Sequence, residues 1–358
     1  MEWKEDILGN VLEVKYGKDH KKLAEGQYPV YGSGGLMRYV DSKLYDGPSI
    51  LIPRKGTLNN IMFVESPFWT VDTMFWTIIN ADKIDPKFLF YSICKRDFAS
   101  MNVGSAVPSM TVSILNDIQI SYPKNLADQR RIASILSSLD RKIELNNKIN
   151  ADLEEMAQAI FKNWFVDFEP FKDGEFVDSE LGMIPEGWKV GCLGDIAEIT
   201  SGKRPPKKSK DKTKELFIPL IGASDIMGFT SDVLYERPIL VIGRVGTHGV
   251  VQRFQEKCWP SDNTLVVESS YYNYVYQLLK GIDYSAINRG STQPLITQTD
   301  VKNTDVIIAP ENVLKEYESI TSTLFSKHRA NIKESSRLSL LRDTLLPRLM
   351  SGELEVPE

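Results

Sequence analysis

Residues 48–57 read PSILIPRKGT and residues 238–247 read PILVIGRVGT, so an apolar run that leads into an Arg-x-Gly-Thr turn occurs twice. Three further segments return in the same order at a shift of about 185 to 190 residues, namely ILGNVLEV (7–14) as CLGDIAEI (192–199), YPVYGS (28–33) as IPLIGA (218–223) and GSAVP (104–108) as GSTQP (290–294). One such match would be weak, because glycine and proline mark turns in every fold. Four matches in register indicate an internal repeat.

Each copy begins with short runs typical of β-strands and ends in a long helical pattern. Apolar residues recur at spacings of three and four over about 126–165 in the first copy and about 313–346 in the second. At about 1.5 Å per residue the first helix would be about 60 Å long, so we expect each helix to need a partner helix. The predicted interface comprises Ile132, Leu136, Leu139, Ile143, Asn146 and Leu153 on the first helix, and Ile320, Leu324, Asn331, Leu338, Leu341 and Leu345 on the second.

An asparagine interrupts each apolar stripe, Asn146 in the first helix and Asn331 in the second. A buried asparagine can fix the register of a coiled coil at some cost in stability. The other interpretation is that both side chains face solvent, and the sequence leaves the two interpretations open.

A chain of 358 residues is longer than one hydrophobic core normally accommodates, which favours two domains. The repeat therefore predicts an α+β protein with two mixed α/β domains, each followed by a long helix. The predicted division is a first domain at 1–122, a first helix at 123–166, a linker at 167–190, a second domain at 191–309, and a second helix with the C-terminal tail at 310–358.

The charges are segregated along the chain, although the net charge is only −5 at pH 7. Residues 201–214 read SGKRPPKKSKDKTK and contain seven basic residues against Asp211 alone. Residues 167–186 contain seven acidic residues against Lys172 alone. Such segregation indicates separate basic and acidic surfaces with different partners.

The cellular compartment is predicted from three features. Cys94, Cys192 and Cys258 are scattered and form no C-x-x-C pair, which suits reduced thiols. The first ten residues lack the basic and then apolar pattern of a signal peptide, and no apolar stretch of about 18 residues occurs. We therefore expect a cytoplasmic protein with no membrane partner.

No enzyme motif emerges from the sequence. The Gly-Lys pairs at Gly17 and Gly202 lack the first glycine of a phosphate-binding G-x-x-x-x-G-K-[ST] loop. Three histidines cannot supply an H-E-x-x-H metal site. We therefore expect no catalytic residue, no metal site and no cofactor in this chain.

Several strings resemble the specificity subunits of type I restriction-modification systems. They are FKNWFVDFEPF (161–171), DSELGMIPEGW (178–188) and LRDTLLPRLMSGEL (341–354), with DQRRI (128–132) and LDRKI (139–143) in the first helix. The resemblance covers essentially the whole chain. One departure is that the second helix has EYESI (316–320) where the family usually starts with Gln-x-x-Ile.

This resemblance implies that each repeat is a target-recognition domain and that the helices form an antiparallel coiled coil with pseudo-twofold symmetry. It implies a bipartite, asymmetric double-stranded DNA target and two modification subunits, which carry S-adenosylmethionine and methylate adenine. Restriction subunits that use ATP and Mg would add translocation and cleavage. The helix pair and Trp164–Trp188 are the expected docking surfaces, although Trp164, Phe165 and Phe168 could equally be packing residues.

Sequence readout of DNA requires Arg or Lys at guanine and Asn or Gln at adenine, while phosphate contacts set position. The candidate contacts are Lys15, Lys18, Lys21, Lys22, Arg54, Lys55, Asn59, Asn60, Lys203, Arg204, Lys207, Lys208, Lys210, Arg244, His248 and Arg289. The basic run could instead be a solvated flexible loop, and the repeated turn could be scaffold only.

Two other functions fit the same features. The chain could be the specificity subunit of a type IIB-like system, in which cleavage belongs to a partner polypeptide. It could also be a coiled-coil scaffold whose β domains bind protein or carbohydrate. The scaffold predicts no salt-sensitive DNA binding, whereas recognition through phosphates predicts a steep loss of affinity as salt rises.

Overall fold

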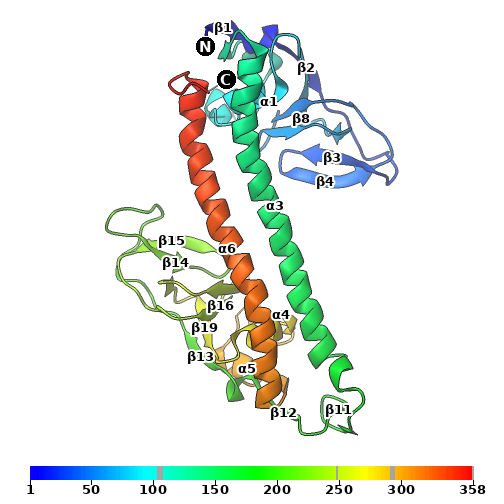
Figure 1. Ribbon diagram of the computed structural model, residues 1–358, viewed down its shortest axis with the longest axis vertical. Coiled ribbons are helices and arrows are strands. Elements are labelled where there is room, and N and C mark those ends of the chain that lie inside the picture. The colour runs from blue at the N-terminus through cyan, green and yellow to red at the C-terminus, as the bar shows by residue number, and fades with distance from the viewer. Residues whose placement is uncertain (103–107, 247–248, 291–294, 357–358) are drawn as a thin grey trace. The chain divides into compact units, whose positions relative to one another are not determined.

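The computed structural model describes residues 1–102, 108–246, 249–290 and 295–356. The chain divides into two compact units, unit 1 (Met1–Asn147 with Ile332–Glu358) and unit 2 (Lys148–Asn331). Figure 1 shows their elements. Each unit combines one β-rich repeat with half of each long helix, so the compact units cut across the division by chain order that the sequence predicts.

Unit 1 holds the first repeat. Its elements are β1 (Trp3–Ile7), η1 (Leu8–Asn10), β2 (Leu12–Tyr16), β3 (Tyr28–Gly32), β4 (Gly35–Val40), β5 (Ser49–Pro53), β6 (Met62–Val64), β7 (Trp69–Thr70), β8 (Met74–Ile79), α1 (Pro86–Ile93), η2 (Phe98–Met101), α2 (Val112–Asn116) and β9 (Gln119–Pro123). Its sheets have the strand orders β2-β8-β5-β6, β4-β3-β7 and β1-β9.

Unit 2 holds the second repeat. Its elements are η3 (Glu169–Phe171), β10 (Phe176–Val177), β11 (Ile184–Pro185), β12 (Lys189–Cys192), η4 (Leu193–Asp195), β13 (Glu198–Ser201), β14 (Ile218–Ile221), β15 (Ile226–Thr230), β16 (Ile239–Gly243), β17 (Val251–Phe254), β18 (Trp259–Pro260), β19 (Thr264–Glu268), α4 (Tyr272–Gly281), α5 (Gln298–Lys302) and β20 (Asp305–Ile308). The strand orders β13-β19-β16-β17, β15-β14-β18 and β12-β20 reproduce those of unit 1. The predicted repeat is therefore confirmed.

The central strands and the short helices form where the sequence favours them. β5 and β16, the two copies of the apolar run, are buried along their whole length, which suits their many β-branched residues. Helix α1 begins after Asp85, whose carboxylate accepts a hydrogen bond from Phe88 N, and has Pro86 in its first turn. Thr297 and Asp300 form a capping box at the start of α5.

Two long helices complete the fold, α3 (Leu126–Phe165) and α6 (Glu311–Met350). The predicted bounds of α3 are confirmed, and α6 is longer at both ends than the predicted 313–346. In unit 1 Arg342 Nη1 donates to Asp140 Oδ1 at 2.6 Å and Asn146 Nδ2 donates to Glu334 Oε2 at 2.9 Å. Residue numbers rise on one helix as they fall on the other, so the helices pack antiparallel (Figure 1).

Both interrupting asparagines are buried between the helices, so the interpretation that they face solvent is wrong. Asn146 and Asn331 are 0% and 1% exposed. In unit 2 Asn331 Nδ2 donates to Asn150 Oδ1 at 2.9 Å. Asn146 Nδ2 also reaches Ser335 Oγ at 3.3 Å in unit 1. The contact between α3 and α6 thus includes a polar layer in each unit, and the hydrogen bonds of these layers specify one register.

Two residues of the predicted helix interface are misplaced. Ile320 and Leu341 are 39% and 46% exposed. The neighbouring residues Thr321 and Arg342 are buried and half-buried instead, and apolar spacing does not reveal polar residues on the inner face. The remaining predicted positions are buried or half-buried: Ile132, Leu136, Leu139, Ile143 and Leu153 on α3, and Leu324, Leu338 and Leu345 on α6.

The aromatic residues at the end of α3 are packing residues of unit 2. Phe165 and Phe168 are 4% and 9% exposed, and the Phe165 ring lies 4.6 Å from Tyr274 and 5.7 Å from Trp188 between centroids. The exposed apolar side chains of this stretch are instead Val166, Val177, Leu181 and Met183. Within the described ranges no helix is long and apolar enough to cross a membrane.

Candidate nucleic-acid interface

The Arg-x-Gly-Thr turns have the same backbone hydrogen bonds in both repeats. Arg54 N donates to Thr73 O at 2.8 Å, and Arg54 O accepts from Met110 N at 2.9 Å. Arg244 N donates to Asn263 O at 2.9 Å, and Arg244 O accepts from Ile296 N at 3.0 Å. The turn glycines Gly56 and Gly246 have φ of 86° and 82°, a conformation that favours glycine. The backbone of the turn is therefore scaffold in both copies.

The two arginine side chains have different surroundings. The guanidinium carbon of Arg54 lies 5.3 Å from the Tyr16 ring centroid, and Nη1 donates to Asp72 O at 3.3 Å. Arg244 Nε is buried and has no hydrogen-bond partner among the described residues. A buried N–H without a partner costs free energy. The arginine at this repeated position therefore has different neighbouring groups in the two copies.

A repeated tryptophan positions the Gly-Lys pairs. Trp69 Nε1 donates to Lys18 O at 2.9 Å, and Trp259 Nε1 donates to Lys203 O at 2.7 Å. A Cβ at the preceding glycine, Gly17 or Gly202, would lie only 2.0 or 2.1 Å from a backbone oxygen of the neighbouring segment. Only glycine permits this approach, and the tryptophans at a shift of 190 residues were the sequence signal that our comparison of the halves missed.

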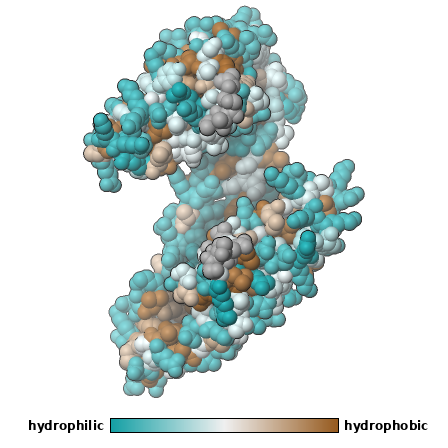
Figure 2. Space-filling view, turned by 180° about the vertical axis from the view of Figure 1, so that it is seen from behind, coloured by the Kyte–Doolittle hydropathy of each residue, from teal (hydrophilic) through white to brown (hydrophobic). Residues whose placement is uncertain are grey.

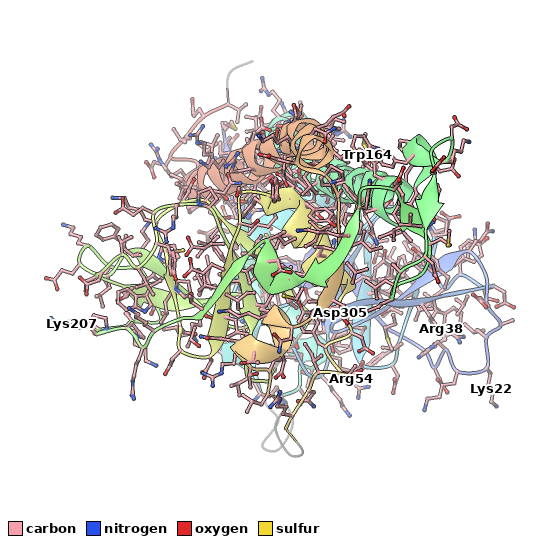
Figure 3. All side chains as sticks on the ribbon, turned by 90° about the horizontal axis from the view of Figure 1, so that it is seen from below. Lys22, Arg38, Arg54, Trp164, Lys207 and Asp305 are labelled. Atoms are coloured by element: carbon pink, nitrogen blue, oxygen red, sulfur yellow. The ribbon has the colours of Figure 1, made fainter. Side chains whose placement is uncertain are left out.

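The basic segment of unit 1 is a loop that β4 holds in place. Arg38 Nη2 donates to the carbonyl oxygens of His20 and Leu23 at 3.0 and 2.6 Å. Lys18, Lys21 and Lys22 are exposed, and Figure 3 shows Lys22 at the outer edge of its domain. Lys15 differs from them, because it lies in β2 and forms an ion pair with Glu13.

The basic segment of unit 2 is anchored at its centre. Ser209 exchanges backbone hydrogen bonds of 2.9 and 2.8 Å with Phe229 of β15, so the run is not a free loop along its whole length. The five predicted cations here are exposed and have no ion-pair partner in the part of the chain that the structure describes; they are Lys203, Arg204, Lys207, Lys208 and Lys210. Figure 3 shows Lys207 at the edge of its domain. Several of these residues line a cleft of about 380 Å³ with Met227, Asp262 and Asn263.

The remaining candidates vary in their availability to DNA. Asn59 Nδ2 donates to Asp97 Oδ1 at 3.1 Å and its Oδ1 accepts from Ala99 N at 2.9 Å, while Asn60 Nδ2 donates to Ser33 O at 2.8 Å. Both amides therefore hold loops of unit 1. Arg289 is ion-paired with Asp300, and Lys55 is exposed. His248 lies outside the described residues.

Comparison with known proteins defines the family. The model of the type I restriction modification DNA specificity domain matches residues 1–155 and 185–334. The type I restriction enzyme MjaIX specificity subunit of Methanocaldococcus jannaschii is 31% identical, over 94% of this chain and 86% of the relative. The HindI specificity subunit of Haemophilus influenzae is 23% identical, over 82% of this chain and 83% of the relative.

A solved structure shows the same fold. The crystal structure of the type I restriction-modification S subunit from M. genitalium superposes with a TM-score of 0.68 at 17% identity, covering 97% of this chain and 96% of that one. The chain belongs to the family of type I restriction-modification specificity subunits, and the predicted resemblance is confirmed. Members of this family have a DNA-recognition role rather than a catalytic one.

Proposed function

We propose that this chain recognises a bipartite, asymmetric DNA target, one half-site for each repeat. The proposal rests on one observation. In both repeats the same backbone frame presents exposed cations at the same place, but the neighbouring side chains differ. Exposed cations with no internal partner supply phosphate contacts, and side chains that differ between the copies would read different bases. Two readers on one chain suit two half-sites at a set spacing.

The catalytic steps belong to partner subunits in this proposal. Two modification subunits would carry S-adenosylmethionine and methylate adenine, and restriction subunits, where present, would use ATP and Mg. The outer faces of the helices and the exposed residues Val166, Val177, Leu181 and Met183 are the docking surfaces. Exposed apolar side chains beside acidic residues suit a protein partner better than DNA. The assembly would act in the cytoplasm.

Mapping of methylated adenines tests this function. DNA from cells that contain this chain and its modification subunits is expected to carry one methylated motif with two unequal halves and an unspecified spacer. A motif without a spacer, or no motif that depends on this chain, would overturn the proposal.

The phosphate contacts can be tested separately with the variant K207Q/K208Q/K210Q. Each lost phosphate contact reduces the slope of log affinity against log salt by about 0.9. We expect weaker binding, a shallower salt dependence and an unchanged methylated motif. Unchanged affinity at low salt would show that these lysines do not contact DNA, and salt-independent binding by the wild type would favour the scaffold function.

A further inference from the structure

The hairpins β3–β4 and β14–β15 contain a β-bulge at the same position. Val30 pairs with Arg38 but Tyr31 pairs with Leu36, so Met37 is the extra residue of β4. In unit 2 Leu220 pairs with Gly228 but Ile221 pairs with Ile226, so Met227 is the extra residue of β15. A bulge removes a residue from the ladder and redirects its side chain.

The redirected side chain is a methionine in both copies, and it lies across the facing strand in the same way. A Cβ at Gly32 would lie 2.6 Å from Met37 Sδ, and a Cβ at Gly222 would lie 3.5 Å from Met227 Sδ. Gly32 therefore leaves room for the thioether, whereas a Cβ at Gly222 would make only an ordinary van der Waals contact with it. The bulge, the glycine and the methionine are thus common to both hairpins, whose sequences also match at Pro29 and Pro219.

About half of each methionine side chain is exposed to solvent. Met37 is 55% and Met227 is 48% exposed, and their neighbours Leu36 and Ile226 are 52% and 44% exposed. Each hairpin thus presents an apolar pair on a surface that is otherwise mainly hydrophilic (Figure 2). Covering such side chains with a ligand would release them from water, at a gain that scales with the area buried.

The surroundings of these side chains indicate nucleic acid as the ligand. Met227 lines the same cleft as Arg204, Lys207 and Lys208. In unit 1 the hairpin tip contacts the Arg54 turn, because Ser33 O accepts from Asn60 and a Cβ at Gly56 would lie 3.1 Å from Ser33 Oγ. An apolar side chain among cations suits a ligand with phosphates outside and apolar base surfaces inside.

We infer that Met37 and Met227 are base-contacting residues, one for each half-site, whose side chains press on apolar surfaces that bases expose in a groove. These surfaces are the thymine methyl group and the faces of bases at an opened step. Methionine is suited to both, because its unbranched thioether adapts to irregular surfaces. The inference rests on the proposed function.

The test uses the chain assembled with its modification subunits and the target found by methylation mapping. M37A and M227A are each expected to weaken target binding about 10-fold or more. The salt dependence should stay unchanged, because no phosphate contact is lost. Tyr39→Ala and Phe217→Ala remove exposed side chains of the same two hairpins, 49% exposed in each case, and should change affinity by less than about 2-fold.

Altered half-sites make the test specific. M37A should have no further effect on DNA whose first half-site is scrambled, and M227A none when the second is scrambled. M37L and M227L should restore most of the binding, which shows that the losses do not come from misfolding. Wild-type affinity of M37A and M227A for an intact target would overturn the inference while leaving the proposed function in place. A wild-type complex that binds no sequence specifically would overturn the proposed function itself.

Deoxyuridine in place of thymine distinguishes the two base surfaces. If the wild type binds the substituted target as weakly as M37A or M227A binds the normal one, and the variants lose nothing further, the contact is with thymine methyl groups. If the variants weaken binding equally on both targets, the contact is with base faces. Both outcomes support base contact.

Discussion

The two repeats fasten their β domains to the helices with different chemistry. In unit 1 Phe63 of β6 pairs with Ile50 of β5, and its ring lies 5.6 Å from Phe90 of α1. The same position in unit 2 is Arg253 of β17, which pairs with Leu240 of β16. The Arg253 guanidinium carbon lies 4.7, 4.5 and 3.6 Å from the ring centroids of Tyr272, Tyr276 and Phe325. An apolar contact in one copy is thus a half-buried cation among aromatic rings in the other.

Each joint also contains an acidic side chain, at positions that do not correspond between the repeats. In unit 1 Asp140 accepts from Tyr91 Oη at 2.5 Å and from Arg342 at 2.6 Å. In unit 2 Glu318 accepts from the backbone N–H groups of Asn273 and Tyr274, each at 2.8 Å, at the start of α4. The strand pairing is thus the same in both copies, while the side chains that join the strands to the helices differ.

Removing the Arg253 side chain is expected to have the largest effect. R253A should lower the unfolding free energy of unit 2 by about 3–5 kcal/mol, because it removes the cation near Glu154 and Glu318 and leaves a gap between three rings. Hydrogen exchange in α4 and the first half of α6 measures the loss. F63A should cost less, in unit 1 only, because it removes a ring but no charge. Equal hydrogen exchange in wild type and R253A would show that Arg253 does not stabilise unit 2.

A pH effect is expected in unit 2. Burial raises the pKa of Glu318 to about 6, from an ordinary value of 4.5. The folded chain therefore carries a cost above pH 6 that vanishes below pH 4.5, about 2 kcal/mol in all. Between pH 7 and 4.5 wild type should gain this amount relative to E318Q, as measured by urea unfolding at each pH.

Two features ensure that the difference between wild type and E318Q reports on the titration of Glu318. Burial lowers the pKa of His328, but both chains contain this residue, so its titration cancels in the difference. A glutamine can still accept the two backbone hydrogen bonds. A constant difference across this pH range would show that Glu318 titrates as it does in the unfolded chain.

Removal of one tyrosine hydroxyl should destabilise the two units by different amounts. Y91F is expected to cost about 1.5 kcal/mol, because it removes a hydrogen bond to the charged Asp140. Y276F removes a longer bond of 3.0 Å to Glu154, which keeps Lys280 at 3.3 Å, and should cost less. Unit-resolved hydrogen exchange of the two variants gives the ranking, and a larger loss for Y276F would contradict it.

The smallest expected effect concerns the asparagine layers. N150A should cost about 1 kcal/mol, because the buried Asn331 Nδ2 loses its acceptor. S335A should cost under about 0.5 kcal/mol, since Asn146 Nδ2 keeps Glu334 Oε2. Thermal unfolding of both variants measures the difference, and equal losses would contradict this ranking.

The sequence predicted features that depend on local pattern. Matching segments revealed the repeat and its Arg-x-Gly-Thr turns, and apolar spacing placed α3 at Leu126–Phe165. The exposed run from Lys203 to Lys210 also followed from composition. These features are visible in sequence because the backbone adopts them from neighbours a few residues away.

Only the tertiary structure decided which side chains face each other. It showed that Asn146 and Asn331 are buried between the helices, that Ile320 and Leu341 are exposed, and that Arg253 lies among aromatic rings. It also showed that Met37 and Met227 occupy matching bulges. Spacing along one segment reports its period, but burial, pairing and redirection of a side chain depend on partners far away in the chain.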